Sequence, residues 1–356
     1  MALGGYSFLD KLSQAQARHL YEQGATFLLL NLPPKSIFGI DTNSWEIGDK
    51  FKGVKMIPSG VHFIFCQSIG REGCTGPVIG FFHVFKPKEL LVKEWDIKAE
   101  IFSSKEFSEI DLNPIRTDLR LYEPCLAPYP YDNLKTWVSL TNHVTDLSLA
   151  KIGINGAISA FDIAEFSKGE TKEGCIKFSH IPLPSISKGA SPIDITRAHI
   201  DRSHILLDCL KNNYQDNCTS LFGEIQCSFL LFVYGHIYEG FEQWRRLVEL
   251  LCSCDQALVT SSQLYSHFIT ILHFQLNTIP VEFLLTNDQS SKVITEQNIF
   301  LVPVLNNLFL NLKESSVCSE LKDRADRFKS MLIHKFKWNF EVTEEDMPVI
   351  VNLGKL

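Results

Sequence analysis

Histidine and cysteine side chains mark the few places in this chain where metal binding or covalent catalysis could occur. His62 and His83 lie in two successive stretches with the apolar pattern of neighbouring strands, so their imidazoles could meet as metal ligands. No third ligand follows at a recognisable spacing, and we expect no metal site. Cys252 and Cys254 would need a nearby base to act as nucleophiles, and their spacing points the two thiols to different sides of a helix. We interpret both as packing or solvent-facing thiols at a helix end.

The sequence patterns that usually reveal an enzyme are missing from this chain. It contains no G-x-S-x-G nucleophile elbow, no phosphate-binding G-x-x-x-x-G-K-[ST], no G-x-G-x-x-G and no H-E-x-x-H. Glycines at positions 70, 73, 76 and 80 are closely spaced, but no Lys-Ser or Lys-Thr follows them, so they favour turns over a phosphate cradle. We therefore predict a protein without catalytic residues, cofactor or metal.

Length and composition predict a two-domain globular protein. The 356 residues exceed the roughly 250 at which single cores stop growing, and 45% hydrophobic with 21% charged residues is enough apolar surface for a packed fold. A net charge of −7 argues against a broad basic surface for nucleic acid. The ten cysteines contain no C-x-x-C pair, which favours free thiols in a reducing compartment over disulfides.

Neither export nor membrane insertion is indicated by the sequence. The first residues lack the basic and apolar regions of a secretory signal. The longest apolar stretch, around residues 229–234, is far shorter than the ~20 residues that cross a bilayer. We expect a soluble intracellular protein without a membrane contact.

The first part of the chain has the pattern of a β-rich domain. A helix is expected over residues 10–23, closed by Gly24 in a left-handed conformation. Short apolar runs typical of strands follow, separated by Gly, Pro, Asn and Asp, at residues 26–30, 61–65, 78–85 and 90–95. They predict a sandwich-like or barrel-like fold. Gly39, Gly48, Gly53 and Gly60 are expected to set turns between short strands. Two flanking helices are expected near residues 109–122 and 131–144.

The rest of the chain reads as a linker followed by helices. Residues 151–192 are rich in Gly, Ser and Pro and have little periodicity, although residues 177–182 could dock as an extended piece. Apolar residues spaced by three and four then predict an amphipathic helix over 235–252, with Phe241 and Trp244 buried. Pro303 either starts a helix or kinks one.

We therefore predict an α+β two-domain fold, with a β-sandwich-like N-terminal domain that has flanking helices and an all-helical C-terminal domain. The expected boundaries are 1–150 for the β-rich domain, 151–192 for the linker, 193–336 for the helical domain and 337–356 for a C-terminal tail.

Several longer segments are too specific to be described by periodicity alone. They are residues 38–48 (FGIDTNSWEIG), 51–63 (FKGVKMIPSGVHF), 80–82 (GFF), 128–131 (PYPY) with 134–135 (LK), 137–142 (WVSLTN), 223–226 (GEIQ), 238–247 (YEGFEQWRRL) and 335–340 (KFKWNF). In this order they closely resemble the signature blocks of the AAR2 splicing factor family. The resemblance spans nearly the whole chain and is weakest between residues 145 and 192.

This resemblance implies that the protein functions by binding and holding another protein. It implies an assembly chaperone of the U5 small nuclear ribonucleoprotein (snRNP), present in cytoplasm and nucleus and monomeric. The implied partner is the spliceosomal scaffold Prp8, bound at its C-terminal region of RNase H-like and Jab/MPN-like domains, where it would keep the helicase Brr2 off. It also implies a VHS-like architecture for the helical domain. A VHS-like trafficking adaptor and a Cys or His hydrolase are the competing hypotheses, with only the helical half and the thiols in their favour.

The C-terminal tail supplies most of the candidate interface residues. Aromatic and apolar side chains alternate with polar ones after residue 336, which is the two-residue period of a strand. The tail either adds an edge strand to a sheet of the scaffold, or folds back through Trp338 and Phe340 so that only its last residues are free. Trp45 either fills the N-terminal core or stands at the interface. The candidate interface residues are Trp338, Phe340, Val342, Val349, Val351, Leu353 and Trp45.

Overall fold

The computed structural model describes residues 8, 12–69, 74–154, 158–159, 176–182, 201–281 and 292–340. The chain divides into two compact units, Met1–Ile181 with Cys209–Leu247, and Pro182–Asp208 with Val248–Leu356. The division passes through helices α8 (Ser203–Tyr214) and α10 (Tyr238–Cys252). Residues 209–247 are thus grouped with the strands, whereas the sequence alone places a boundary between residues 150 and 193.

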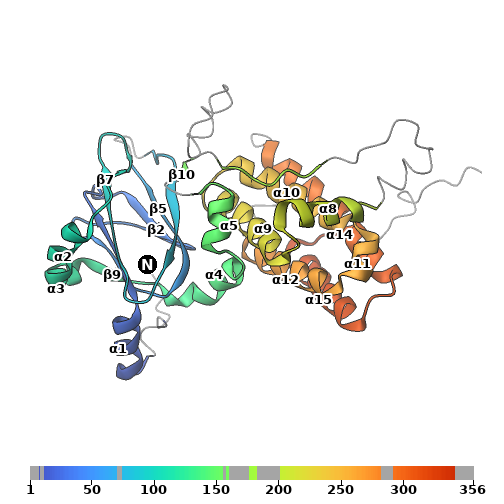
Figure 1. The fold of residues 1–356 in the computed structure, drawn as a ribbon, viewed down its shortest axis with the longest axis horizontal. Coiled ribbons are helices and arrows are strands. Elements are labelled where there is room, and N and C mark those ends of the chain that lie inside the picture. Colours follow the sequence, from blue (N-terminus) through green and yellow to red (C-terminus); the bar gives the residue numbers. More distant parts are fainter. Residues whose placement is uncertain are drawn as a thin grey trace, which may run out of the picture. The chain divides into compact units, whose positions relative to one another are not determined.

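Two five-stranded sheets lie in the first unit (Figure 1). Their orders are β8-β7-β1-β4-β9 and β10-β6-β5-β2-β3. The strands are β1 Ala25–Leu30, β2 Ile37–Ile40, β3 Asn43–Glu46, β4 Gly53–Ile57, β5 Gly60–Gln67, β6 Ile79–Phe85, β7 Leu90–Asp96, β8 Ile101–Phe102, β9 Leu126–Pro128 and β10 Ile158–Ser159. One core cluster combines buried residues of both sheets, so the predicted sandwich-like arrangement is confirmed.

The same unit also contains helices. They are α1 Gln14–Gln23, α2 Glu109–Thr117, α3 Leu119–Tyr122, α4 Leu134–Thr141, α5 Asp146–Lys151 and α9 Cys218–Val233, with short 3-10 turns η2 Glu123–Cys125 and η3 Tyr131–Asn133. Apolar side chains in α2 and α3, and in the residues next to these helices, pack on Leu28, Val92 and Leu126. These three residues face away from the main core. Because β1 is covered on both faces, its apolar run is continuous rather than alternating.

The second unit is helical in its described part. Besides the ends of α8 and α10 it contains α11 Asp255–Thr260, α12 Ser262–Thr278, α14 Lys292–Glu314 and α15 Ser319–Phe336. Pro303 lies inside α14, so it does not start a separate helix. The last helix, α15, packs against α12 and α14 through a stripe that includes Leu321, Phe328 and Leu332. The expected all-helical C-terminal region is confirmed.

The first helix was predicted to end at a left-handed Gly24, and this prediction was wrong. Helix α1 begins after Ser13, whose side chain forms a capping box with Gln16, rather than at residue 10. Gly24 follows the helix in an extended conformation, with φ −65° and ψ 146°, not a left-handed one. A Cβ at this position would lie 2.6 Å from the Leu20 carbonyl oxygen and 2.6 Å from Cα of Met56. Gly24 is therefore needed for the close approach of α1 to β4.

Glycines in the block 38–63 serve two different purposes. Gly53 and Gly60 have φ values of 143° and 132°, as expected of residues that set turns. Gly39 was predicted to set a turn as well, but it lies inside β2 opposite Phe65. A Cβ on Gly39 would come within 2.1 Å of the Phe65 ring, so the aromatic side chain takes the space above this glycine.

Three further expectations can be checked against the described residues. Within them, no helix is long and apolar enough to cross a membrane. The cysteines of this part are all unpaired, in agreement with the predicted free thiols. Helix α10 begins at Tyr238 rather than near residue 235, and its Phe241 and Trp244 side chains are buried as predicted.

Candidate functional site

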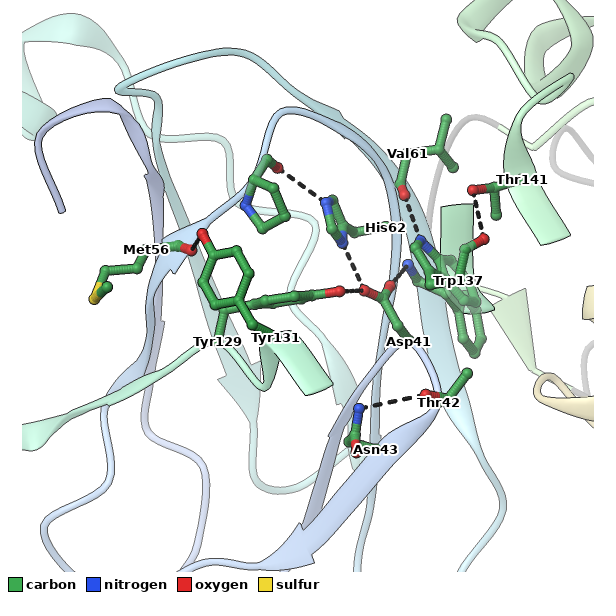
Figure 2. A network of polar contacts seen from close by, with 12 residues as sticks. Asp41, Thr42, Asn43, Met56, Val61, His62, Tyr129, Tyr131, Trp137 and Thr141 are labelled. Atoms are coloured by element: carbon green, nitrogen blue, oxygen red, sulfur yellow. Dashed lines mark hydrogen bonds and ion pairs between the residues drawn. The ribbon is translucent and has the colours of Figure 1, made fainter. Parts of the chain in front are cut away.

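A buried carboxylate, Asp41, joins three segments of the family-like blocks (Figure 2). Its Oδ1 accepts a hydrogen bond of 3.0 Å from the backbone N–H of Phe63. Its Oδ2 lies 2.7 Å from Nδ1 of His62 and accepts a 2.6 Å bond from the Tyr129 hydroxyl. Since Asp41 is only 1% exposed, these donors take the place of water around it. The site holds the end of β2, strand β5 and the segment after β9 together.

His62 and His83 are directly opposite each other in the β5–β6 register, as the sequence suggested. Both ring nitrogens of His62 are occupied, because Nε2 lies 2.9 Å from the carbonyl oxygen of Pro58. Nε2 of His83 lies 2.7 Å from Oε1 of Glu89. Each imidazole is thus engaged with a carboxylate of its own. In the described ranges, no group of three or more His, Cys, Asp or Glu side chains is placed to hold a metal ion.

The two tyrosines of the PYPY block act as hydrogen-bond donors. Burial, and then the charge of Asp41, raises the pKa of Tyr129. Burial raises the pKa of Tyr131 to about 12. Both phenols therefore keep their protons at neutral pH, and the Tyr131 hydroxyl donates to the carbonyl oxygen of Met56 at 2.7 Å. The block fixes the segment after β9 onto β2 and β4.

The WVSLTN block attaches helix α4 to the strands. Nε1 of Trp137 donates to the carbonyl oxygen of Val61 at 2.7 Å, and the indole is 1% exposed. Figure 2 shows this bond beside the Asp41 network. Trp137 therefore satisfies a backbone carbonyl of β5 while it fills apolar space between α4 and the sheet.

A second buried carboxylate, Glu224 of the GEIQ block, lies in helix α9 and is 1% exposed. It accepts hydrogen bonds from Nε2 of Gln243 at 2.9 Å and from both the N–H and the hydroxyl of Ser179, at 2.8 and 2.7 Å. Nζ of Lys151 lies 3.4 Å from Oε2 of Glu224 and 3.7 Å from the centre of the Tyr214 ring. Burial lowers the pKa of Lys151 although Glu224 acts against it.

The other residues of the GEIQ block connect α9 to the end of α4. Oε1 of Gln226 accepts a 2.9 Å bond from the N–H of His143, and its Nε2 donates to Oδ1 of Asn142 at 2.7 Å. A Cβ on Gly223 would lie 2.7 Å from the His143 carbonyl oxygen. The glycine therefore allows the close approach that the glutamine bonds require.

Trp45 lies at the rim of the N-terminal core. Its half-buried ring makes edge-on contacts with Phe38 at 5.5 Å and Phe51 at 6.3 Å between ring centres. We expect Trp45→Ala to destabilise the protein by about 1–3 kcal/mol, since part of the ring contacts solvent and the rest packs on aromatic neighbours. Urea unfolding monitored by circular dichroism measures this loss.

The exposed neighbour Ser44 provides the matched control, and Ser44→Ala should change stability by less than about 0.5 kcal/mol. Unchanged unfolding of Trp45→Ala together with weaker partner binding would instead assign Trp45 to the interface.

The structure places Trp338 and Phe340 in the protein's own helical unit, 8% and 4% exposed. Trp338 stacks on Phe336 at 4.8 Å, and the Phe340 ring stands edge-on to Phe309 at 5.2 Å. Lys337, in the left-handed conformation, ends α15 and turns the chain toward these contacts. The fold-back alternative is therefore the one observed for these two residues. Val342, Val349, Val351 and Leu353 lie outside the described residues, and their place in an interface stays a prediction.

Cys252 and Cys254 are buried packing residues, which was one of the two interpretations. They are 1% and 0% exposed, and Sγ of Cys254 lies 3.0 Å from the Leu250 carbonyl oxygen. Burial raises the pKa of Cys252 well above its usual value and that of Cys254 to about 12. Both thiols are therefore protonated at neutral pH and poorly suited to nucleophilic attack.

The sequence interpretation missed the two carboxylates that organise the site. Asp41 and Glu224 are each a charged residue beside strongly apolar stretches, at positions that end up fully buried. A charge at such a position is rarely buried without partners, and this was the available signal. The partners of Asp41 lie 21 to 88 residues away from it along the chain, and those of Glu224 lie 19 to 73 residues away, so the pairings themselves had no local pattern.

Comparison with known proteins gives a consistent result over both domains. The model of the AAR2 N-terminal domain matches residues 23–153, and the model of the AAR2 C-terminal repeat region matches residues 178–341. The protein AAR2 homolog of Mus musculus is 33% identical, over 95% of this chain and 96% of the relative. That of Caenorhabditis elegans is 33% identical over 90% and 96%. The A1 cistron-splicing factor AAR2 of Saccharomyces cerevisiae is 22% identical over 70% and 76%.

Proposed function

This chain belongs to the AAR2 family, and from that premise we propose that it is a non-enzymatic assembly chaperone of the U5 snRNP in pre-mRNA splicing. It binds the C-terminal region of the scaffold Prp8, with its RNase H-like and Jab/MPN-like domains, and blocks premature binding of the helicase Brr2. We further propose that it acts as a monomer in the cytoplasm and nucleus. The yeast relative is named as a splicing factor, and the family is not named for a reaction.

The observation that carries the proposal is the match along nearly the entire chain. A relative of 33% identity covers 95% of it, and both family models match in order. The quoted blocks supply the buried residues that fold the first unit, among them Asp41, Tyr129, Trp137 and Glu224. Since these residues are used for structure, family function resides in the surfaces that this fold presents.

Charge supports a protein partner over an RNA partner. A net charge of −7 gives little attraction to phosphate, although the proposed particle contains RNA. An acidic protein can associate with such a particle by binding its protein scaffold, without recognising its RNA. We expect no direct contact with nucleic acid.

Affinity purification of the tagged full-length protein under gentle conditions, followed by mass spectrometry, tests the proposal. Prp8 and other U5 proteins should be recovered, and Brr2 should be depleted relative to Prp8. In a second assay with purified components, this protein should reduce the amount of Brr2 bound to the Prp8 C-terminal region. Recovery of no spliceosomal protein, or simultaneous binding of Brr2 without competition, would contradict it.

A further inference from the structure

A short stretch between the strands and the later helices is held like a bound peptide. Residues 176–181, here called the strap, have no regular secondary structure. The N–H of Lys177 donates to the carbonyl oxygen of Ile152 at 2.8 Å, and Nδ2 of Asn213 donates to the carbonyl oxygen of His180 at 2.9 Å. Main-chain groups of the strap are therefore bound at both its ends. The docking that the sequence suggested for residues 177–182 is confirmed.

Ser179, in the middle of the strap, has all three of its polar groups bound. Its N–H donates to Oε1 of Glu224 at 2.8 Å, and its hydroxyl donates to Oε2 at 2.7 Å. Its carbonyl oxygen accepts a 3.0 Å bond from Nε2 of Gln243. A carboxylate that accepts hydrogen bonds from both the amide and the hydroxyl of one residue distinguishes serine and threonine from alanine at this position.

The two side chains that hold Ser179 are here called the platform. Glu224 in α9 and Gln243 in α10 are 1% and 4% exposed, and they are bonded to each other at 2.9 Å. Phe229 and Trp244 pack together beside them, with ring centres 5.7 Å apart. The platform is thus ordered by contacts that do not involve the strap, as expected of a preformed binding site.

An empty platform would be unfavourable. Without the strap, the buried Glu224 would lose the two donors of Ser179 and keep the bonds from Lys151 and Gln243. Because a buried carboxylate needs such donors, the strap is replaced at low cost only by a segment that offers the same groups.

From these contacts we propose that α9 and α10 form a peptide-binding site for an extended segment with serine or threonine at its centre, and that the chain fills this site with its own strap. The strap is then an autoinhibitory ligand that excludes other segments of this chemistry. The site is distinct from the C-terminal tail, and it does not depend on the function proposed above.

A trans-binding experiment tests the site directly. In the full-length protein, residues 176–181 are replaced by alternating Gly and Ala, and a fluorescein-labelled peptide of residues 176–183 is titrated by fluorescence anisotropy. We expect saturable 1:1 binding to the replaced protein, at least tenfold tighter than to the wild type, whose own strap competes. A peptide with Thr at the serine position should bind comparably, and one with Ala at least tenfold more weakly.

Glu224→Gln in the strap-replaced protein should also weaken binding of the serine peptide at least tenfold. The proposal is overturned if a strap-replaced protein with wild-type thermal unfolding does not bind the peptide. Equal binding of the Ser and Ala peptides, or equal binding to the wild type, would overturn it too.

Should strap replacement prevent folding, hydrogen exchange of the single variant Ser179→Ala gives the answer. The amides of Lys177 and Ser179 should lose protection in this variant while those of α9 keep theirs. Unchanged protection of the strap amides would show that Ser179 is not the recognised residue.

Discussion

Asp41→Ala is expected to destabilise the strand-containing unit by about 3–5 kcal/mol, as typical for removal of one partner from a buried ion pair or network. The substitution leaves the N–H of Phe63, the imidazole of His62 and the hydroxyl of Tyr129 without their acceptor. All three groups are buried, so water cannot reach them without opening the core. The loss is a large share of the roughly 5–15 kcal/mol that usually separates folded and unfolded states.

Asp41→Asn separates the shape of this side chain from its charge. Its amide oxygen can still accept from Phe63, and its NH₂ group can donate to Nδ1 of a neutral His62 that donates through Nε2 to Pro58. The Tyr129 proton, however, finds no second acceptor. We therefore expect a smaller loss of about 1–3 kcal/mol for this variant.

Urea unfolding followed by tryptophan fluorescence measures both losses. Asp49→Ala removes an exposed carboxylate just after the block that contains Asp41, and it should change stability by less than about 0.5 kcal/mol. If Asp41→Ala were as stable as Asp49→Ala, the three short contacts would not be structural, and the buried carboxylate would need another explanation.

How far the sequence predicts this fold depends on the range of the interactions involved. The strands β1, β5, β6 and β7 follow from local runs of apolar residues, and all four were predicted at nearly the observed positions. The capping box of Ser13 is equally local but was overlooked, because the residues before it also allow a helix. Gly24 and Gly39 were misinterpreted because their role depends on Met56 and Phe65, which approach from other strands.

The tail shows what a periodic pattern does and does not determine. The alternation after residue 336 has the period of a strand, but residues 337–340 form no strand, and Lys337 is left-handed. Phe336, Trp338 and Phe340 nevertheless gather on one side of the chain, where their rings contact one another. The alternation did not indicate which surface covers that side. The observed cover is Phe309 of α14, with Nζ of Lys329 5.8 Å from the Phe340 ring centre. A period of two indicates that one face of the segment is buried, whereas the surface that packs on this face depends on the rest of the molecule.

The same contacts divide the tail into two parts with different expected roles. Residues 337–340, which we call the tail anchor, belong to the helical unit, because Trp338 and Phe340 are buried in it. The residues after position 340 contain the remaining alternating apolar side chains Val342, Val349, Val351 and Leu353. We propose that this second part adds a strand to a sheet of the Prp8 region, through main-chain hydrogen bonds and pockets for alternate side chains.

Deleting residues 341–356 should therefore weaken binding to the Prp8 C-terminal region at least tenfold, or about 1.4 kcal/mol. The expected loss is modest because ordering a tail on binding offsets several kcal/mol of the gross interaction energy. Thermal unfolding should be unchanged, since the tail anchor is retained. Isothermal titration calorimetry with the purified Prp8 region and differential scanning calorimetry measure the two quantities.

The longer deletion of residues 337–356 is the matched comparison. It removes Trp338 and Phe340, whose truncation to alanine would each cost about 3–5 kcal/mol if they behave as buried aromatics. Its melting temperature should fall by at least several degrees, while that of the shorter deletion stays at the wild-type value. Full affinity of the shorter deletion would end the strand-addition proposal. A lowered melting temperature of the shorter deletion would mean that the anchor extends beyond Phe340, so that part of the predicted strand serves the protein's own fold.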